Sequence, residues 1–244
     1  MMKYSFNGHG IVVRETINKN NFKTPFFYEK IVTPFGKLFG IELKYNSDIN
    51  NTYSTHIRNS FLDRERRVAI LKKKILFSYS VSHLFTTHRM CCLISEDLSI
   101  LNVILKDRVI ENFIARMPFI WLGINNTEEL SLMIKKRLLS RLSERHIILL
   151  NNFLSDSDHY EIISTGFISA VKINNRNSAI SHERIKFMIR KATKFTPLII
   201  TEEIDNMYIK GVTAIQLQSK HHTINSELFS NVIPSFCYDK DHRK

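Results

Sequence analysis

Short hydrophobic runs recur along the chain, separated by stretches of mixed polarity. There are eight such runs, at positions 26–32, 38–43, 90–94, 119–124, 146–150, 169–173, 197–201 and 213–217. Apolar runs of this length, bounded by polar or turn-forming residues, are typical of buried β-strands. The pattern therefore predicts eight strands.

The segments between the later runs have helical periodicity. From position 96 to 116, apolar residues recur every three or four positions, at Leu98, Leu101, Leu105, Val109 and Phe113. From 181 to 195, the same spacing predicts one apolar helix face, formed by Ile185, Met188, Ile189 and Ala192. Helices that alternate with buried strands favour crossover connections and a parallel sheet.

The first two runs are joined differently. The residues between them read "TPFGK", a Pro–Gly turn, which predicts an antiparallel hairpin. Eight strands with one reversed predict an α/β, TIM-like barrel with one antiparallel strand, in a single domain. We place this domain at 22–233, with terminal extensions at 1–21 and 234–244, and we expect the polar, asparagine-rich segment 46–59 to be a loop.

Composition excludes several classes of protein. The chain has 244 residues, 43% of them hydrophobic, which is enough for one sizeable core. No apolar run approaches the roughly 18 residues that a membrane span needs, and the first residues lack the layout of a signal peptide. Cys91 and Cys92 are adjacent in an apolar run and far from Cys237, a spacing that predicts neither a disulfide framework nor a zinc site. We therefore expect a cytoplasmic protein without a membrane contact.

The net charge is +12, and the seven glycines form no phosphate-binding loop. Basic residues collect in four segments, at 64–74, 135–145, 184–194 and the C-terminal tail. A nucleic-acid surface is one interpretation of this charge. Because the charge is divided among four segments, we favour solvated helix faces and an acidic protein partner.

The residues that follow the predicted strands bear on catalysis, because barrel enzymes carry their chemistry at the carboxyl ends of the strands. Three successive strands end in asparagine pairs, at 125–126, 151–152 and 174–175. Hard metal ions are held by charged oxygens, and a two-metal site needs several of them. An amide oxygen carries no charge and cannot replace a bridging carboxylate.

The order of motifs resembles that of the EAL domain, a cyclic-di-GMP phosphodiesterase fold, over residues 22–218. The motifs are "GKLFGIELKYN", "CLISEDL", "FIWLGINN", "LLNNFLSD", "AVKINN", "LIITEEIDN" and "GVTAIQLQ". Within this family the chain is most similar to the short, degenerate, stand-alone members of enteric bacteria, the YdiV-type group, which bind the flagellar regulator subunit FlhD.

The resemblance implies a dismantled metal site. Four family positions are retained, at Glu42, Lys172, Glu202 and Gln216. Five are substituted, at Leu93, Asn125, Asn151, Asn152 and Asn174, where the family has metal-binding or catalytic Asn, Glu and Asp residues. We expect the surviving carboxylates to be hydrogen-bonded or solvated, and Lys172 to form an ion pair with one of them.

By resemblance, the chain is expected to be a non-enzymatic regulator without metal or cofactor. It would bind FlhD and keep the FlhD–FlhC activator off flagellar promoters, and it would not bind cyclic-di-GMP or DNA. Two alternatives stay open. One is a basic DNA-binding regulator, in which 142–153 would begin a helix-turn-helix and 182–194 would be its recognition helix. The other is a weak phosphodiesterase or cyclic-di-GMP sensor.

Overall fold

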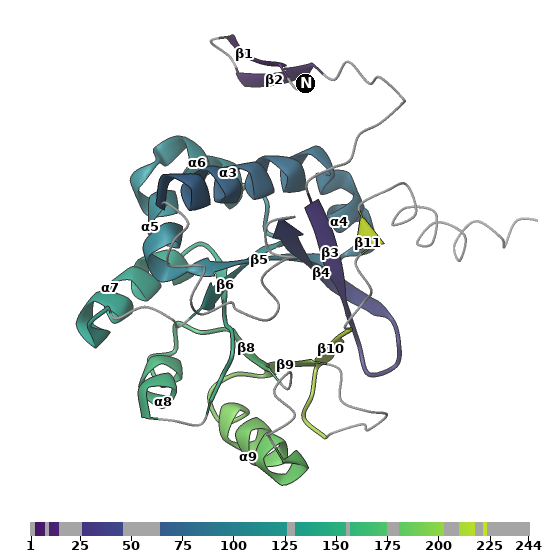
Figure 1. Ribbon diagram of the computed structural model, residues 1–244, viewed down its shortest axis with the longest axis vertical. Coiled ribbons are helices and arrows are strands. Elements are labelled where there is room, and N and C mark those ends of the chain that lie inside the picture. Colours follow the sequence, from purple (N-terminus) through teal and green to yellow (C-terminus); the bar gives the residue numbers. More distant parts are fainter. Residues whose placement is uncertain are drawn as a thin grey trace, which may run out of the picture.

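A closed barrel of parallel strands, completed by one reversed strand, forms the centre of the computed structural model (Figure 1). The structure describes residues 3–7, 10–14, 26–45, 64–125, 130–154, 157–174, 181–202, 210–217 and 222–223. The barrel strands are β3 (Phe26–Val32), β4 (Leu38–Tyr45), β5 (Cys91–Asp97), β6 (Ile120–Asn125), β7 (Ile147–Leu150), β8 (Ala170–Ile173), β9 (Leu198–Glu202) and β10 (Ala214–Gln216). Each predicted run forms one of these strands.

Strand β3 runs against its two barrel neighbours and closes the barrel. It pairs antiparallel with β4 on one side and with β10 on the other, whereas β4 to β10 are parallel to one another. The β3–β4 turn is held by the Gly36 amide, which donates to the Thr33 carbonyl at 2.9 Å. Gly36 has φ +79°, a conformation that glycine adopts without strain. The predicted hairpin and the predicted barrel with one antiparallel strand are both confirmed.

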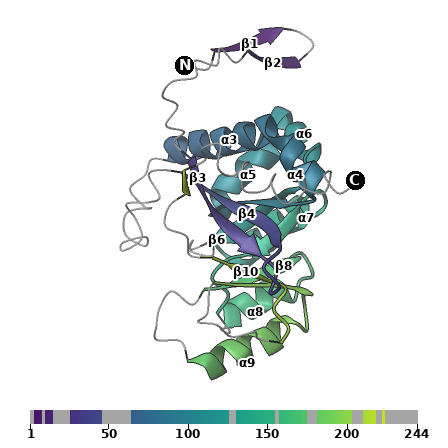
Figure 2. The same ribbon diagram turned by 90° about the vertical axis from the view of Figure 1, so that its right-hand side faces the viewer.

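Helices cover the outside of the barrel in both views (Figures 1 and 2). They are α3 (Arg64–Ser80), α4 (Ser82–His88), α5 (Leu98–Lys106), α6 (Arg108–Ala115), α7 (Leu132–Ser143), α8 (Ser157–Ile163) and α9 (His182–Ala192). The two views agree that α3 and α6 lie at one end of the molecule and α9 at the other. None of the described helices is long and apolar enough to cross a membrane.

The segment 96–116, for which the spacing predicts helical character, forms two helices, α5 and α6. Asp107 has an extended backbone between α5 and α6, and its carboxylate accepts hydrogen bonds from the amides of Val109 and Ile110 at 3.1 and 3.3 Å. An aspartate in this position caps the next helix. Val109 is 58% exposed, so it does not continue the buried face.

The interior of the barrel is divided into an apolar layer and a polar layer. The apolar layer contains Ile31, Cys91, Leu93, Trp121, Leu149, Ala170, Ile200 and Ala214. Two positions further along their strands lie Ser95, Gly123, Asn151, Lys172, Glu202 and Gln216. Side chains two positions apart point to the same face of a strand, so the polar residues lie above the apolar layer, at the carboxyl ends of the strands. This arrangement creates the candidate site.

Three short strands are described in addition to the eight strands of the barrel. Strands β1 (Lys3–Asn7) and β2 (Gly10–Arg14) form an antiparallel pair within the predicted N-terminal extension. Strand β11 (His222–Thr223) pairs antiparallel with β3. The predicted loop at 46–59 lies outside the described residues.

Candidate functional site

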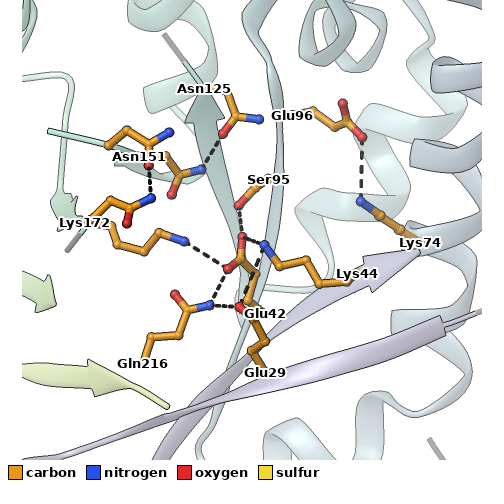
Figure 3. A network of polar contacts seen from close by, with 12 residues as sticks. Glu29, Glu42, Lys44, Lys74, Ser95, Glu96, Asn125, Asn151, Lys172 and Gln216 are labelled. Atoms are coloured by element: carbon orange, nitrogen blue, oxygen red, sulfur yellow. Dashed lines mark hydrogen bonds and ion pairs between the residues drawn. The ribbon is translucent and has the colours of Figure 1, made fainter. Parts of the chain in front are cut away.

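Glu42 is the centre of a buried polar network inside the barrel mouth (Figure 3). The side chain comes from β4 and is 1% exposed. Its Oε1 accepts a hydrogen bond from Ser95 Oγ at 2.6 Å and lies 3.0 Å from Lys44 Nζ. Its Oε2 accepts from Lys172 Nζ at 3.0 Å and from Gln216 Nε2 at 2.6 Å. Donors from β4, β5, β8 and β10 thus surround both carboxylate oxygens.

The two lysines determine the charge state of Glu42. Burial alone would raise the pKa of this carboxyl group, because the charged form loses its hydration. The positive charges of Lys172 and Lys44, with hydrogen bonds from Ser95 and Lys172, outweigh this effect and hold the Glu42 pKa well below its usual value. Glu42 is therefore ionised at physiological pH, and the positive charges of Lys44 and Lys172 balance its negative charge.

The network also crosses the seam at which the barrel closes. Gln216 Nε2 donates to Glu29 Oε2 as well as to Glu42, and Lys44 Nζ lies 3.9 Å from Glu29 Oε2. Glu29 belongs to the reversed strand β3, which pairs with β4 and β10. The polar contacts therefore connect the three strands on which closure of the barrel depends.

The asparagines that follow the strands pair with each other. Asn151 Nδ2 donates to Asn125 Oδ1 at 2.9 Å, and Asn174 Nδ2 donates to Asn152 Oδ1 at 3.0 Å. Asn152 has φ +53°, a left-handed conformation that asparagine tolerates better than most residues. Within the described residues, the buried Asn151 Oδ1 has no hydrogen-bond donor. The four amides form two neutral pairs.

The remaining predicted site residues lie in different layers. Leu93 is fully buried in the apolar layer and pairs in register with Glu42. The residue of β5 that reaches the Glu42 carboxylate is Ser95, two positions further along. Glu202 is buried at the end of β9, in register with Gln216. The prediction that Lys172 pairs with a surviving glutamate is confirmed, and Glu42 is its partner.

Sequence reasoning missed the part that Lys44 and Ser95 play. Lys44 lies two positions after Glu42, and Ser95 lies two positions after Leu93. Glu42 and Leu93 were predicted site positions, so the alternation of side chains along a strand could have identified Lys44 and Ser95 as facing the same side. Glu29 gave no such signal, because its place in the site depends on how β3 pairs with β4 and β10.

A second polar cluster lies between α3 and β5. Arg67 contacts Glu96 at 2.9 Å and Asp97 at 2.6 Å, and Lys74 Nζ lies 3.6 Å from Glu96. Burial lowers the Arg67 pKa, but the two carboxylates outweigh it and the net shift is upward. We predicted that the charged residues of 64–74 form an exposed helix face. This prediction is wrong for Arg67 and for Lys74, which is only 3% exposed. Both side chains turn inward and pair with the carboxylates at the end of β5.

Comparison with known proteins gives matches in structure and none in sequence. No protein-family model matches the chain, and no curated protein matches it. Among solved structures, the EAL-like domain protein YdiV superposes with a TM-score of 0.64 at 16% identity, covering 84% of this chain and 94% of YdiV. The phosphodiesterase PaMucR, in complex with c-di-GMP, gives a TM-score of 0.61 at 11% identity, covering 83% and 98%. The chain has the EAL-domain fold.

A third EAL-domain protein, YkuI of Bacillus subtilis, was solved with c-di-GMP and calcium. It gives a TM-score of 0.58 at 12% identity and covers 82% of this chain and 55% of YkuI. Calcium takes six to eight oxygen ligands, usually several carboxylates. In the EAL-like barrel described here, Glu42 already contacts two ammonium groups, and the carboxyl ends of β6 and β7 supply neutral amides.

The site residues that the structure describes therefore do not fit a divalent metal ion. Among the described residues, no three His, Cys, Asp or Glu side chains are grouped so that they could hold one. The charges that a metal would supply next to Glu42 are supplied by Lys44 and Lys172. Asparagine at 125 and 151 adds oxygen atoms without the negative charge that a second ion would require.

Proposed function

We propose that this EAL-like barrel is a non-enzymatic regulator that binds FlhD and thereby represses flagellar gene expression and motility. The observation that carries the proposal is the environment of Glu42, whose two carboxylate oxygens are occupied by Lys44, Ser95, Lys172 and Gln216. An EAL-type barrel with this interior retains its fold and lacks the charges of a metallohydrolase.

The chemistry argues against phosphodiester hydrolysis. Metal ions would have to lower the pKa of an attacking water and neutralise the developing charge on the phosphate. The amides at positions 125, 151, 152 and 174 provide no negative charge to hold such ions. Lys172 is not placed as a general base, because its ammonium group is 3.0 Å from Glu42 and is 5% exposed. Cyclic-di-GMP binding is disfavoured for the same reason, since no metal charge is available to neutralise its phosphates.

The choice of a protein partner rests on two kinds of support. A barrel that has lost its chemistry still presents rigid helices as docking surfaces. The motif order resembles the YdiV-type group, and the resemblance implies FlhD as the partner. The fold similarity to YdiV is in agreement with this proposal.

The proposal is tested with purified full-length chain and the FlhD–FlhC complex of an enteric bacterium. We expect FlhD to co-purify with the chain at low salt, and we expect the chain to abolish the mobility shift of a flagellar promoter by FlhD–FlhC. Failure of FlhD to co-purify would overturn the proposal. A sequence-specific shift by the chain alone would favour a DNA-binding regulator instead.

Two measurements with cyclic-di-GMP complete the test. We expect no Mg²⁺- or Mn²⁺-dependent hydrolysis of cyclic-di-GMP and no binding of the dinucleotide by calorimetry. Hydrolysis that disappears in Glu42→Ala would establish a phosphodiesterase. Micromolar or tighter binding without hydrolysis would establish a sensor.

A further inference from the structure

Three aromatic rings and a lysine form an ordered surface over α8 and α9. Phe187 and Phe195 are 43% and 40% exposed. Tyr160 packs edge-on against Phe195, with ring centroids 5.8 Å apart. Lys191 Nζ lies 5.3 Å from the ring centroid of Tyr160 and 5.3 Å from that of Phe187. These distances are within the range of cation–π attraction, so Lys191 orders the rings around it.

This surface does not arise from a loosely attached helix. The opposite face of α9 is fully buried in the core, through Ile185, Met188, Ile189 and Ala192. Ser181 caps the helix by accepting a hydrogen bond from the Arg184 amide at 3.3 Å. Because α9 is fixed on its inner side, the exposure of Phe187 on its outer side is a stable feature of the folded chain.

Basic residues flank the exposed phenylalanine at helical spacing. Arg184, Phe187 and Lys191 follow one another at intervals of three and four residues, which places them along one stripe of α9, and Lys194 lies in the turn just after the helix ends at Ala192. Arg184 and Lys194 are exposed. Segment 182–194 contains five basic residues and a single acidic one, Glu183, which pairs with Lys186 at 3.0 Å. The stripe is therefore positively charged and has an apolar centre.

We propose that this surface, defined by Tyr160, Arg184, Phe187, Lys191, Lys194 and Phe195 and called the α8–α9 face, docks an acidic amphipathic helix of a partner protein. The inference rests on the proposed function, in that the chain acts through a protein contact, and it specifies where that contact is made. A partner helix with an apolar stripe would cover Phe187 and Phe195. Carboxylates on either side of that stripe would pair with Arg184 and Lys194.

The apolar centre distinguishes a protein helix from duplex DNA as the occupant. A duplex presents phosphates and base edges, and phosphate contacts would use the basic residues and not the phenyl rings. Two phenyl rings that are about two-fifths exposed would gain little from a phosphate backbone. Aromatic and arginine side chains together are the composition found at the energetic centres of protein interfaces.

The first experiment measures the α8–α9 face without reference to FlhD. The probe is a fluorescent, helical, alanine-rich peptide with a leucine stripe flanked by glutamates, and its control has glutamines in place of the glutamates. We expect the full chain to bind the glutamate peptide at least about tenfold more tightly at low salt, with the difference reduced in high salt. Equal binding of the two peptides, no binding of either, or competition for the same residues by a DNA duplex at lower concentration would overturn the inference.

Matched variants locate the contact. The double variant Arg184→Glu/Lys194→Glu should weaken peptide binding by about tenfold or more, because it reverses both flanking charges. The control Arg66→Glu/Lys73→Glu makes the same change in charge at two exposed positions of α3, at the other end of the molecule, and should stay within about twofold of the native chain. Phe187→Ala should weaken binding, whereas Met133→Ala, at a residue 79% exposed on α7, should not. Thermal melts check that every variant folds.

The same variants are then tested with FlhD, so that the two proposals can fail separately. If FlhD binds the native chain and the Arg66/Lys73 control but not the Arg184/Lys194 variant, both proposals stand. If FlhD binds all three equally, the FlhD proposal stands and the docking surface is wrong. If FlhD binds none while the glutamate peptide binds through Arg184 and Lys194, the docking surface stands and FlhD is the wrong partner.

Discussion

Lys172 Nζ lies 3.0 Å from Glu42 Oε2, so that β8 and β4 are joined across the interior of the barrel by a buried ion pair. The two side chains are 5% and 1% exposed. A buried pair of this kind does not by itself add much net stability, since both groups lose their hydration. Its removal from one side is costly, because the other charge is left buried. The barrel interior therefore depends on the match between its charges.

The Lys172→Met variant should be destabilised by about 3 kcal/mol, toward the low end of the range for breaking a buried pair because Lys44 still neutralises Glu42. Urea unfolding measures the loss. The matched control is Lys136→Met, which breaks an exposed pair with Glu161 at 3.0 Å and should cost less than about 1 kcal/mol. Adding Glu42→Gln to Lys172→Met should restore part of the lost stability. Equal losses in the two lysine variants would contradict this account.

Stability should also fall with acidification through Glu42. The folded pKa of Glu42 is well below its ordinary value, so the folded state binds this proton more weakly than the unfolded state does. The contribution of Glu42 is complete above its unfolded pKa of about 4.3 and is lost as the pH falls toward the folded pKa. The free energy of unfolding, measured from pH 7 down to 3, should therefore decline more steeply in the native chain than in Glu42→Gln. Parallel curves for the two proteins would show that Glu42 does not contribute.

Divalent metal ions should leave the melting temperature of the native chain unchanged. Millimolar Mg²⁺ or Ca²⁺ should not bind, because Lys44 and Lys172 already balance the charge of Glu42 and the asparagines carry no charge. A variant with Asn125→Glu, Asn151→Asp and Asn152→Asp, combined with Lys44→Leu, restores negative charge and removes one competing cation. Thermal melts of this variant should rise with Mg²⁺, by an amount equivalent to about 2.7 kcal/mol at a hundred times its Kd. A metal-dependent rise in the melting temperature of the native chain would contradict the interpretation that Lys44 and Lys172 supply the charge that a metal ion would supply.

The strands were predictable because each is a short apolar run between polar segments, and alternation along β7 and β8 further predicts that Asn151 and Lys172 enter the same layer. The order of motifs gave the substituted family positions, and their correspondence to the family's metal ligands stays a prediction. By contrast, the polar network around Glu42 depends on the pairing of strands that are far apart in the sequence. Gln216 reaches Glu42 because β10 closes the barrel against β3.

Two local features, the helix boundary at Asp107 and the burial of Lys74, could not be predicted from the hydrophobic pattern, for different reasons. The apolar spacing continues across Asp107, so periodicity alone did not reveal the helix boundary, although an aspartate before two free backbone amides is a recognised capping signal. Lys74 lies among the other basic residues of α3, and its burial follows from carboxylates on β5. A pattern along one helix does not contain that information.

Close packing around two glycines gives a final prediction that separates backbone from side-chain constraints. A Cβ at Gly40 would overlap Cys91 Sγ and would lie 2.5 Å from the Cys91 carbonyl oxygen. A Cβ at Gly123 would lie 2.5 Å from Ser95 Oγ and 2.9 Å from Asn151 Nδ2, both of which are side-chain atoms. Side chains can rotate, whereas the Cys91 carbonyl is fixed within the pairing of β4 and β5.

We therefore expect Gly123→Ala to cost about 1–3 kcal/mol, as overpacking of a buried site usually does, and Gly40→Ala to cost more. Urea unfolding of both variants provides the comparison. Gly123→Ala should also displace Ser95 from Glu42, so combining it with Ser95→Ala should recover part of the loss, while the same addition to Gly40→Ala should not. A smaller cost for Gly40→Ala than for Gly123→Ala would mean that the β4–β5 pair shifts more easily than the polar layer above it.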